Sequence, residues 1–364
     1  MRTLALFLAS ALLLFSCSNS KDPASLPQSI GGEYEIVVLV DNELTGAPHV
    51  EALKEVLMEN YPMLNQPEPW FSLTWFDVDD VNEYTLKGRY LILLSTCEEG
   101  NKVSTMAEGI FGKDKTDQIP GNDGRFYITG SHAFANPQGI MYLNDVSTSE
   151  LAKKIEANAD GLLSYFESRE SERIKTGLFK YRRKTGLETD IKNALQVNLL
   201  VPTVYEPSVN PFGDATQVYK RLGISNFRWI YSNARHSFSN VAIWSMPYTD
   251  TSQLNLESIL DVRDSVLKYF IPCESDGSYM GTERRFTDVY PTVQVTELNG
   301  KYALELSGLW AAVNGFQGGP FVGYVVVDDE NGRLVFIDGS VAAKGQPKKK
   351  YIVRLKAILS TLKV

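Results

Sequence analysis

The chain has 364 residues, of which 43% are hydrophobic and 22% are charged, and its net charge at pH 7 is −8. This is the composition of an ordinary globular protein that is long enough for two domains. The acidic balance argues against the basic surface that nucleic-acid-binding proteins need, so we expect no nucleic acid as a partner.

The first residues have the parts of an export signal. Arg2 precedes the apolar run Leu4–Phe15, and the small Ser16 follows that run. The run is shorter than the ~20 residues that a membrane-spanning helix needs, so residues 1–16 are predicted to be a signal peptide. Leu14-Phe15-Ser16-Cys17 resembles the lipobox of bacterial lipoproteins. That resemblance implies cleavage before Cys17 and acylation of its sulfur, palmitate included, while an unmodified cysteine near an ordinary cleavage site is the alternative.

Residues 17–32 are small, polar and rich in proline and glycine. We predict a flexible lipidated tether that spans roughly 20 Å. Two or three acyl chains anchor a protein stably to a membrane, whereas a single chain gives only marginal binding. Ser18 in place of an aspartate resembles lipoproteins that are sorted to the outer membrane. Lys21-Asp22 fits either a short surface-export signal or a solvated spacer. We expect an outer-membrane lipoprotein of a Gram-negative envelope, on its periplasmic face or at the cell surface.

Residues 33–168 are predicted to form an N-terminal α/β domain. The domain begins with the apolar run Tyr34–Asp41, which has the length and β-branched content of a strand that is buried on both faces. Helical spacing after Pro48 predicts an amphipathic helix. Ser147 and Glu150 form a capping box, which predicts the start of one long helix. Further strands are predicted at FSLTWF, RYLILLS, GRFYITG and GIMYLND.

Residues 169–196 are predicted to be a basic helical linker. Between residues 169 and 184 there are seven basic residues, and Glu170 and Glu172 are the only acidic ones. Such a segment could contact anionic lipid or a polyanionic glycan. A solvated helix face between two domains is the interpretation that we favour.

Residues 197–364 are predicted to be a C-terminal α+β domain. Strands are expected around Trp229 and at Val241–Met246, followed by a helix from about Leu254 to Tyr269, four further strands and a closing helix. Asn299-Gly300 and Asn331-Gly332 are typical of tight hairpins. The overall fold class is therefore α+β, with two mixed α/β domains, the second a largely antiparallel sheet covered by helices. The order of elements is loosely similar to the Mog1/PsbP-like sandwich.

Motifs for catalysis and cofactor binding are missing from the sequence. It contains no glycine-rich nucleotide loop and no nucleophile elbow, and its three histidines are far apart in the chain. Asp77-Val78-Asp79-Asp80 begins like a calcium loop but lacks the required glycine and glutamate. We therefore assign no catalytic residue, metal or cofactor.

Cys97 and Cys273 are expected to be two small buried thiols, with a disulfide as the alternative.

A ligand-binding region is predicted in the second domain. The glycine-dense segment Asn314–Gly323 is interpreted as a wide loop beside a groove, with a simple hairpin as the alternative. Tyr279, Arg285, Trp310 and Phe316 could line that groove, because aromatic rings stack on sugars and arginine donates directed hydrogen bonds. For Trp310, packing in the core is the favoured interpretation.

A set of short motifs carries a family resemblance. VVLVDNEL, NQPEPWF, MPYTD, GSYMGTE, LSGLW and GGPFVG occur in this order from Val37 to Gly323. Together with the lipobox they resemble a family of bacterial envelope lipoproteins that is catalogued only as a domain of unknown function, which implies no activity. We expect a non-enzymatic scaffold or adaptor that is anchored to membrane lipid through Cys17 and that binds another envelope protein. Binding of a glycan or another small ligand is the alternative, and a hydrolase without a recognisable motif is the second alternative.

Overall fold

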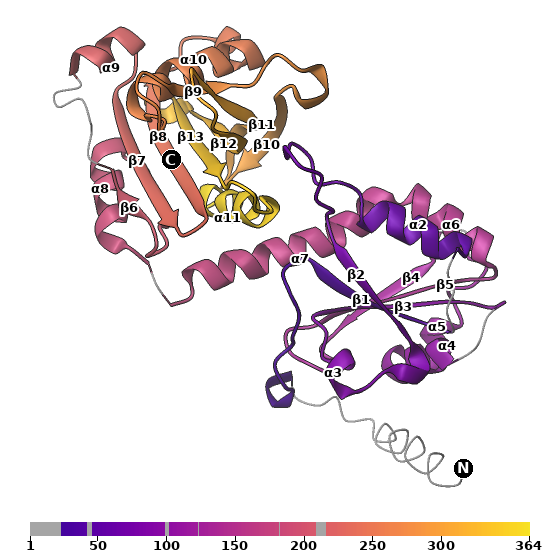
Figure 1. The fold of residues 1–364 in the computed structure, drawn as a ribbon. Helices are drawn as coiled ribbons and strands as arrows, with labels where there is room; N and C mark the ends of the chain where they lie inside the picture. The colour runs from indigo at the N-terminus through magenta and orange to yellow at the C-terminus, as the bar shows by residue number, and fades with distance from the viewer. Residues whose placement is uncertain (1–22, 42–45, 99–101, 123, 182, 209–215) are drawn as a thin grey trace. The chain divides into compact units, whose positions relative to one another are not determined.

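The computed structural model describes residues 23–41, 46–98, 102–122, 124–181, 183–208 and 216–364 (Figure 1). Cys17, the signal peptide and the first part of the tether lie outside the described residues. The chain divides into two compact units. Unit 1 consists of Met1–Asn60 and Pro69–Ser168, and unit 2 consists of Tyr61–Glu68 and Arg169–Val364. The α+β fold class with two domains is confirmed.

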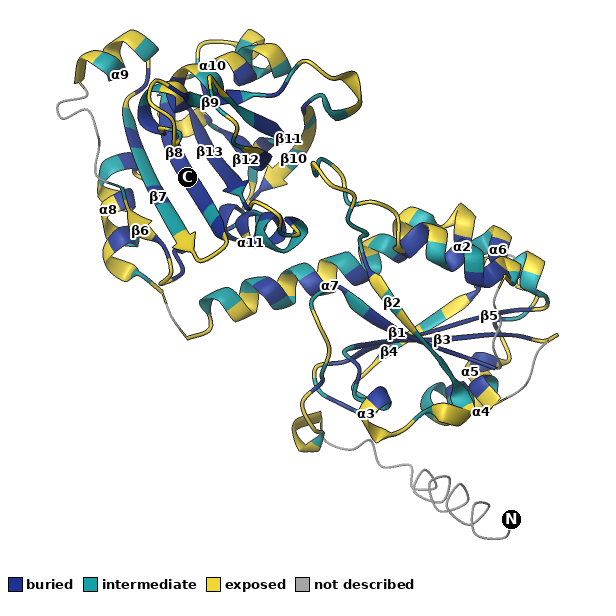
Figure 2. Cartoon of the chain, viewed as in Figure 1, coloured by how far each residue is buried: buried dark blue, intermediate teal, exposed yellow. Residues whose placement is uncertain are grey.

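Unit 1 contains a five-stranded sheet in the order β2-β1-β3-β5-β4. The first four of these strands are parallel, and β4 joins the edge antiparallel to β5. The central strands β1, β3 and β5 are buried almost throughout (Figure 2), which explains their continuous apolar sequences. The strands are β1 (Glu35–Val40), β2 (Ser72–Asp77), β3 (Tyr90–Thr96), β4 (Tyr127–Ser131) and β5 (Gly139–Asp145).

The helices of unit 1 begin at the signals that the sequence contains. Pro48 occupies the first turn of α2, and the side chain of Ser147 accepts the N–H of Glu150 at the start of α6. The long helix predicted from Ser147 is two helices, because α6 ends at Asn158, whose side chain donates to the carbonyl of Lys154. The helices are α2 (Pro48–Leu57), α3 (Glu83–Leu86), α4 (Lys102–Phe111), α5 (Lys113–Thr116), α6 (Thr148–Ala157) and α7 (Ala159–Phe179), with short 3-10 turns η1 (Pro23–Ser25) and η2 (Val78–Asp80). Residues 169–179 of α7 belong to unit 2.

Unit 2 contains an eight-stranded antiparallel sheet in the order β10-β11-β12-β13-β8-β7-β6, and β9 also pairs with β11. The predicted hairpin at Asn299-Gly300 is present, and both residues have positive φ, at 50° and 89°. The strands are β6 (Glu206–Pro207), β7 (Asn226–Ala234), β8 (Ser237–Pro247), β9 (Tyr279–Thr282), β10 (Thr292–Leu298), β11 (Lys301–Val313), β12 (Gly318–Asp328) and β13 (Arg333–Ala342).

Two hydrophobic clusters cover the two faces of this sheet. Helices α8 and α11 contribute to one cluster, and α9 and α10 contribute to the other. Residues 169–196, predicted to be a linker, belong to unit 2, because Leu187, Ile191 and Leu195 of α8 are buried in the first cluster. The helices are α8 (Thr185–Leu195), α9 (Thr216–Leu222), α10 (Leu256–Phe270) and α11 (Lys349–Leu359), with 3-10 turns η3 (Thr251–Leu254), η4 (Thr287–Val289) and η5 (Asp329–Asn331).

The segment Tyr61–Glu68 is part of unit 2 although its neighbours in sequence belong to unit 1. Tyr61 and Leu64 pack against the cluster that contains α11. The carboxylate of Glu68 accepts the backbone N–H groups of Lys348 and Lys349, at 2.5 and 3.1 Å, where α11 begins. Glu68 therefore acts as the N-terminal cap of a helix that lies almost at the other end of the chain.

Both cysteines in the described part of the chain are free thiols. Cys97 is exposed, whereas the sequence predicted a buried thiol, and Cys273 is partly buried.

None of the described helices is both long enough and apolar enough to span a bilayer.

Candidate functional site

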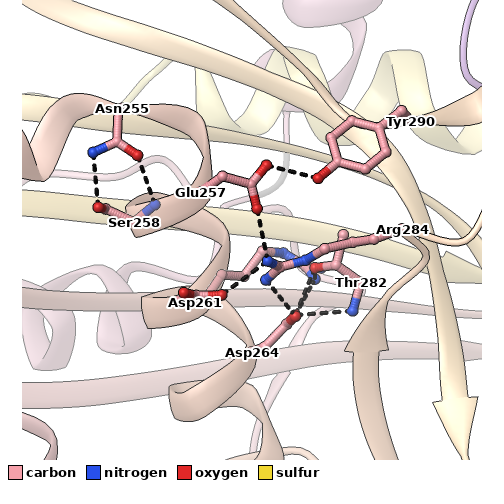
Figure 3. A network of polar contacts seen from close by, with 9 residues as sticks. Asn255, Glu257, Ser258, Asp261, Asp264, Thr282, Arg284 and Tyr290 are labelled. Atoms are coloured by element: carbon pink, nitrogen blue, oxygen red, sulfur yellow. Dashed lines mark hydrogen bonds and ion pairs between the residues drawn. The ribbon is translucent and has the colours of Figure 1, made fainter. Parts of the chain in front are cut away.

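One face of α10 presents three carboxylates to a single arginine. Glu257, Asp261 and Asp264 recur at helical spacing, so their side chains lie along the same face of α10 (Figure 3). Arg284 donates to Glu257 at 3.2 Å, to Asp261 at 2.8 Å and to Asp264 at 2.8 Å. The guanidinium is thus bound on several sides, and the backbone at Arg284 is tied to the helix.

Arg284 begins a loop that interrupts the edge of the sheet. β9 runs antiparallel to β11, and the N–H of Glu283 still donates to the carbonyl of Leu309 at 2.8 Å. If β9 continued in register, Arg285 would pair with Ser307, but Thr292 of β10 takes that place. Residues Arg284–Pro291 therefore leave the sheet edge after Glu283, which lies opposite Leu309, and the chain rejoins the edge at Thr292, two residues further along β11. We call these residues the clamped loop.

Both ends of the clamped loop are fixed to α10. At the far end the hydroxyl of Tyr290 donates to Glu257 at 2.6 Å, and this hydrogen bond raises the pKa of Tyr290. At the near end Asp264 accepts both the N–H and the hydroxyl of Thr282, at 2.8 and 2.5 Å. These contacts are drawn in Figure 3. Hydrogen bonds to ionised groups are the stronger class, so these contacts hold the loop in one conformation.

A buried ion pair between Arg263 and Asp338 also positions Thr282, which precedes the clamped loop. Arg263 of α10 donates to Asp338 of β13 at 2.6 and 3.2 Å, and it lies over the ring of Phe321 at 3.8 Å. Its remaining nitrogen donates to the hydroxyl of Thr282 at 3.0 Å. Burial raises the pKa of Asp338, and the charge of Arg263 opposes that shift. The position of Thr282 is therefore fixed from the core as well as from Asp264.

The outer side of the clamped loop exposes Phe286 and Arg285. The side chain of Phe286 is 57% exposed, and the guanidinium of Arg285 lies 5.5 Å from the centre of its ring. Arg285 also donates to the carboxylate of Glu283 at 2.9 Å, and this contact lowers the pKa of Glu283. An aromatic side chain beside an arginine, both on a fixed loop, is the composition typical of the anchors in protein interfaces.

The four residues predicted to bind a ligand occupy different environments. Arg285 lies in the clamped loop, and Tyr279 is in β9, with the ammonium group of Lys268 4.4 Å from the centre of its ring. Phe316 is fully exposed in the connection between β11 and β12. Trp310 is only 4% exposed and donates to the carbonyl of Val341 at 3.1 Å, so it packs in the core. Arg285, Tyr279 and Phe316 thus lie along the β9 edge or at its ends, while Trp310 points inward.

The prediction of a wide loop at Asn314–Gly323 is wrong, and the hairpin alternative holds. β11 and β12 pair up to Ala311 and Gly318, and Ala312 donates to the carbonyl of Gln317 at 2.8 Å. A side chain at Gly319 would overlap the carbonyl oxygen of Val341. These glycines therefore permit the close approach of neighbouring strands.

A separate pocket of about 270 Å³ lies at the β7 edge of unit 2. Its polar groups already have partners, since Arg228 donates to Asp190 at 2.8 Å and Trp229 donates to Asn240 at 2.8 Å. Polar and apolar atoms contribute about equally to its walls. Its lining includes Leu187, Ile191, Tyr219, Phe227, Ile230 and Phe270.

Ligands for a metal ion do not come together in the part of the chain that is described. Within those residues there is no cluster of three or more histidine, cysteine or carboxylate side chains suited to a metal ion. His132, which follows Ser131 at the end of β4, accepts the N–H of Gln138 through Nδ1 at 3.3 Å. Neither residue is assigned a catalytic role.

Comparison with known proteins identifies domains whose function is unknown. A family model described as "Domain of unknown function (DUF4837)" matches residues 184–361, and "Domain of unknown function (DUF8532)" matches residues 29–179. These matches agree with the resemblance to a family known only as a domain of unknown function. No curated protein matches the chain. A solved structure of a point mutant of the protein Mog1 is 12% identical, with a TM-score of 0.26, over 46% of this chain and 90% of that one. A likeness at this level supports no conclusion about function.

Proposed function

We propose that this chain is a lipid-anchored envelope protein that acts as an adaptor and binds another envelope protein through the clamped loop. The observation that carries the proposal is the fixing of Arg284 and Tyr290 to α10 while Phe286, 57% exposed, faces solvent. A loop that is ordered in advance loses less conformational entropy when it binds. A largely exposed aromatic side chain on such a loop can then be buried by a partner.

Site-specific crosslinking in cells tests the adaptor function. A photoreactive amino acid in place of Phe286 should capture one partner in near-stoichiometric yield, and affinity capture with mass spectrometry then identifies it. In a separate experiment the photoreactive amino acid replaces Arg285, and the yield of crosslinked partner is measured with and without Phe286→Ala. Phe286→Ala should reduce that yield at least tenfold. Tyr84→Ala is the matched control, because Tyr84 is an exposed aromatic residue of unit 1, at 73%. Equal yields from Phe286→Ala and Tyr84→Ala would contradict the proposal.

Anchoring through Cys17 is a separate part of the proposal. Its support is the lipobox-like sequence Leu14–Cys17 together with the tether that follows. Metabolic labelling with a palmitate analogue should label the wild-type chain in the outer-membrane fraction. Cys17→Ala should abolish the label and move the chain out of that fraction. An unlabelled wild-type chain would contradict the anchor without affecting the clamped loop.

A second candidate function is binding of a glycan or another small ligand. The aromatic lining of the pocket at β7 favours it, since sugar faces stack on such rings. Titration of the purified chain with envelope glycans, followed by tryptophan fluorescence, should then show a change that Trp229→Phe reduces. Trp70→Phe is the control, because Trp70 lies in the chain of unit 1. A response that depends on Tyr279 instead would favour the ligand residues predicted from the sequence.

A further inference from the structure

The edge strand β10 exposes a row of backbone groups that can form further hydrogen bonds. Residues 299 and 300 form a two-residue turn, so Leu298 and Lys301 are the hydrogen-bonded pair that closes the hairpin. Hydrogen-bonded pairs recur at every second residue, so Thr292, Gln294 and Thr296 also direct their N–H and C=O groups toward β11. The intervening residues Val293, Val295 and Glu297 must direct theirs away from the sheet.

The contacts at β9 support this assignment. There the N–H of Glu283 points toward β11, because it donates to Leu309, and the N–H of Thr282 points outward. Asp264 of α10 accepts that outward N–H at 2.8 Å. Along β10 no described residue accepts from or donates to the outward groups of Val293, Val295 and Glu297. The same edge is therefore capped at β9 and open at β10.

The open edge lacks the features that usually prevent strands from associating. Thr292–Leu298 contains no proline, lysine or arginine, and its pairing with β11 is unbroken. Glu297 is its only charged residue, and the side chain of Val295 is 70% exposed. Soluble proteins generally protect such an edge with charges, bulges or proline, so an unprotected edge marks a pairing site.

The outward-facing residues of β10 can pair with those of a second copy about Val295. In an antiparallel pair of two copies centred there, Val295 lies opposite Val295, and Val293 lies opposite Glu297 on both sides. All three outward residues of each copy then form hydrogen-bonded pairs, and no two like charges lie directly opposite each other. A two-fold axis requires this kind of self-complementary surface. The two exposed valines cover each other on the same face of the joined sheet.

We propose that two copies of this chain associate through β10, in an antiparallel pair centred on Val295, which joins their sheets into one. This inference does not depend on the clamped loop or on its partner. It places a second copy on a stretch of this edge that α10 leaves uncapped. The directions of the backbone groups then fix the register of the pair.

Cysteine crosslinking in intact cells tests both the contact and its register. In a Cys97→Ser, Cys273→Ser background, Val295→Cys should form a disulfide-linked dimer under mild oxidation, because residues in a hydrogen-bonded pair have Cα atoms about 5.5 Å apart. Glu297→Cys should crosslink at least tenfold less, because its two copies are separated by about 14 Å along the strands. Val293→Cys combined with Glu297→Cys should restore the crosslink. Equal crosslinking by Val295→Cys and Glu297→Cys would overturn the register.

Sedimentation of the full-length chain purified in detergent tests the association itself. The wild-type chain should be dimeric, and Val295→Lys should raise the dissociation constant at least tenfold, because it places two positive charges opposite each other. Val295→Thr, which keeps a β-branched residue, should remain dimeric. A monomeric wild-type chain, or a dimer that Val295→Lys leaves intact, would overturn the proposal. So would a photoreactive residue at Val295 that captures a different protein in place of a second copy.

Discussion

Asp264 accepts the outward-facing N–H of Thr282, so a side chain of α10 takes the place that a neighbouring strand would have at the edge of the sheet. The same carboxylate accepts a hydrogen bond from Arg284 at 2.8 Å. One residue therefore both closes the sheet edge at β9 and fixes the start of the clamped loop. The open edge of β10 begins where these contacts end.

Arg284→Gln should loosen the clamped loop without unfolding unit 2. The substitution removes the charge that three carboxylates of α10 share, so we expect a loss of about 1–2 kcal/mol in the free energy of unfolding. Amide hydrogen exchange between residues 285 and 290 should become at least tenfold faster. Lys301→Gln is the control, since it breaks an exposed ion pair with Glu330 and should change neither quantity measurably. Unchanged exchange in Arg284→Gln would show that the loop is held by other contacts.

The sequence predicts the strands of unit 2 well because their signals are local. The four strands predicted after the helix near residues 254–269 are present as β10 to β13, and Asn299-Gly300 forms the expected two-residue turn. Asn331-Gly332 behaves differently. Asp329–Asn331 form a 3-10 turn and only Gly332 has positive φ, while Asp328 accepts hydrogen bonds from Asn331 and Arg333. The side chain of Asp328, which lies outside the Asn-Gly dipeptide, thus stabilises a 3-10 turn in place of the predicted two-residue turn.

The candidate site is hard to predict from the sequence because its parts become neighbours only in the fold. Spacing alone places Glu257, Asp261 and Asp264 on one helix face, but it cannot show that Arg284 reaches all three. The sequence drew attention to Arg285 and not to Arg284, although the two are adjacent. The sequence does not predict β9, because this strand has only four residues and its place at the edge depends on pairing with β11.

Glu68→Gln should destabilise unit 2 although residue 68 lies between segments of unit 1. The substitution removes the negative charge that accepts two N–H groups at the start of α11, where three consecutive lysines already oppose the helix dipole. We expect a loss of about 1 kcal/mol, measured by thermal or denaturant unfolding. Glu59→Gln, at an exposed position near the same segment, should have no effect. Equal stability of the two variants would mean that the cap does not contribute.

Asp328→Asn should reduce the sensitivity of unit 2 to acid. Burial alone would raise the pKa of Asp328, but hydrogen bonds from Arg333 and Asn331 outweigh it and lower the pKa below its ordinary value of 3.8. The folded state therefore favours the ionised carboxylate, which contributes stability above the unfolded pKa, and this contribution is lost as the pH falls through the folded value. We expect Asp328→Asn to cost about 1–3 kcal/mol at pH 7 and less as the pH falls below about 4.

Unfolding by denaturant at several pH values measures this difference. Asp329→Asn is the matched control, because Asp329 is the next residue and its carboxylate is exposed in an ion pair with Lys301. That control should change stability by less than about 0.5 kcal/mol at every pH. A gap between wild type and Asp328→Asn that stays constant from pH 7 to pH 3 would contradict the assigned pKa shift.

Cys97 should react slowly with alkylating reagents at neutral pH although it is exposed. Although the residue is exposed, its sulfur is partly buried, and this partial burial is the largest cause that raises the pKa of Cys97. The charges of Asp145 and Glu98 raise the pKa further, so the reactive thiolate is scarce at pH 7. In a Cys273→Ser background we expect alkylation at pH 7 to be several-fold slower than for a cysteine in an unstructured peptide. The rate should still be rising at pH 9, and Glu98→Gln should increase the rate at pH 7, while Glu83→Gln should not. A wild-type rate at pH 7 equal to that of the peptide would show that these carboxylates do not act on the thiol.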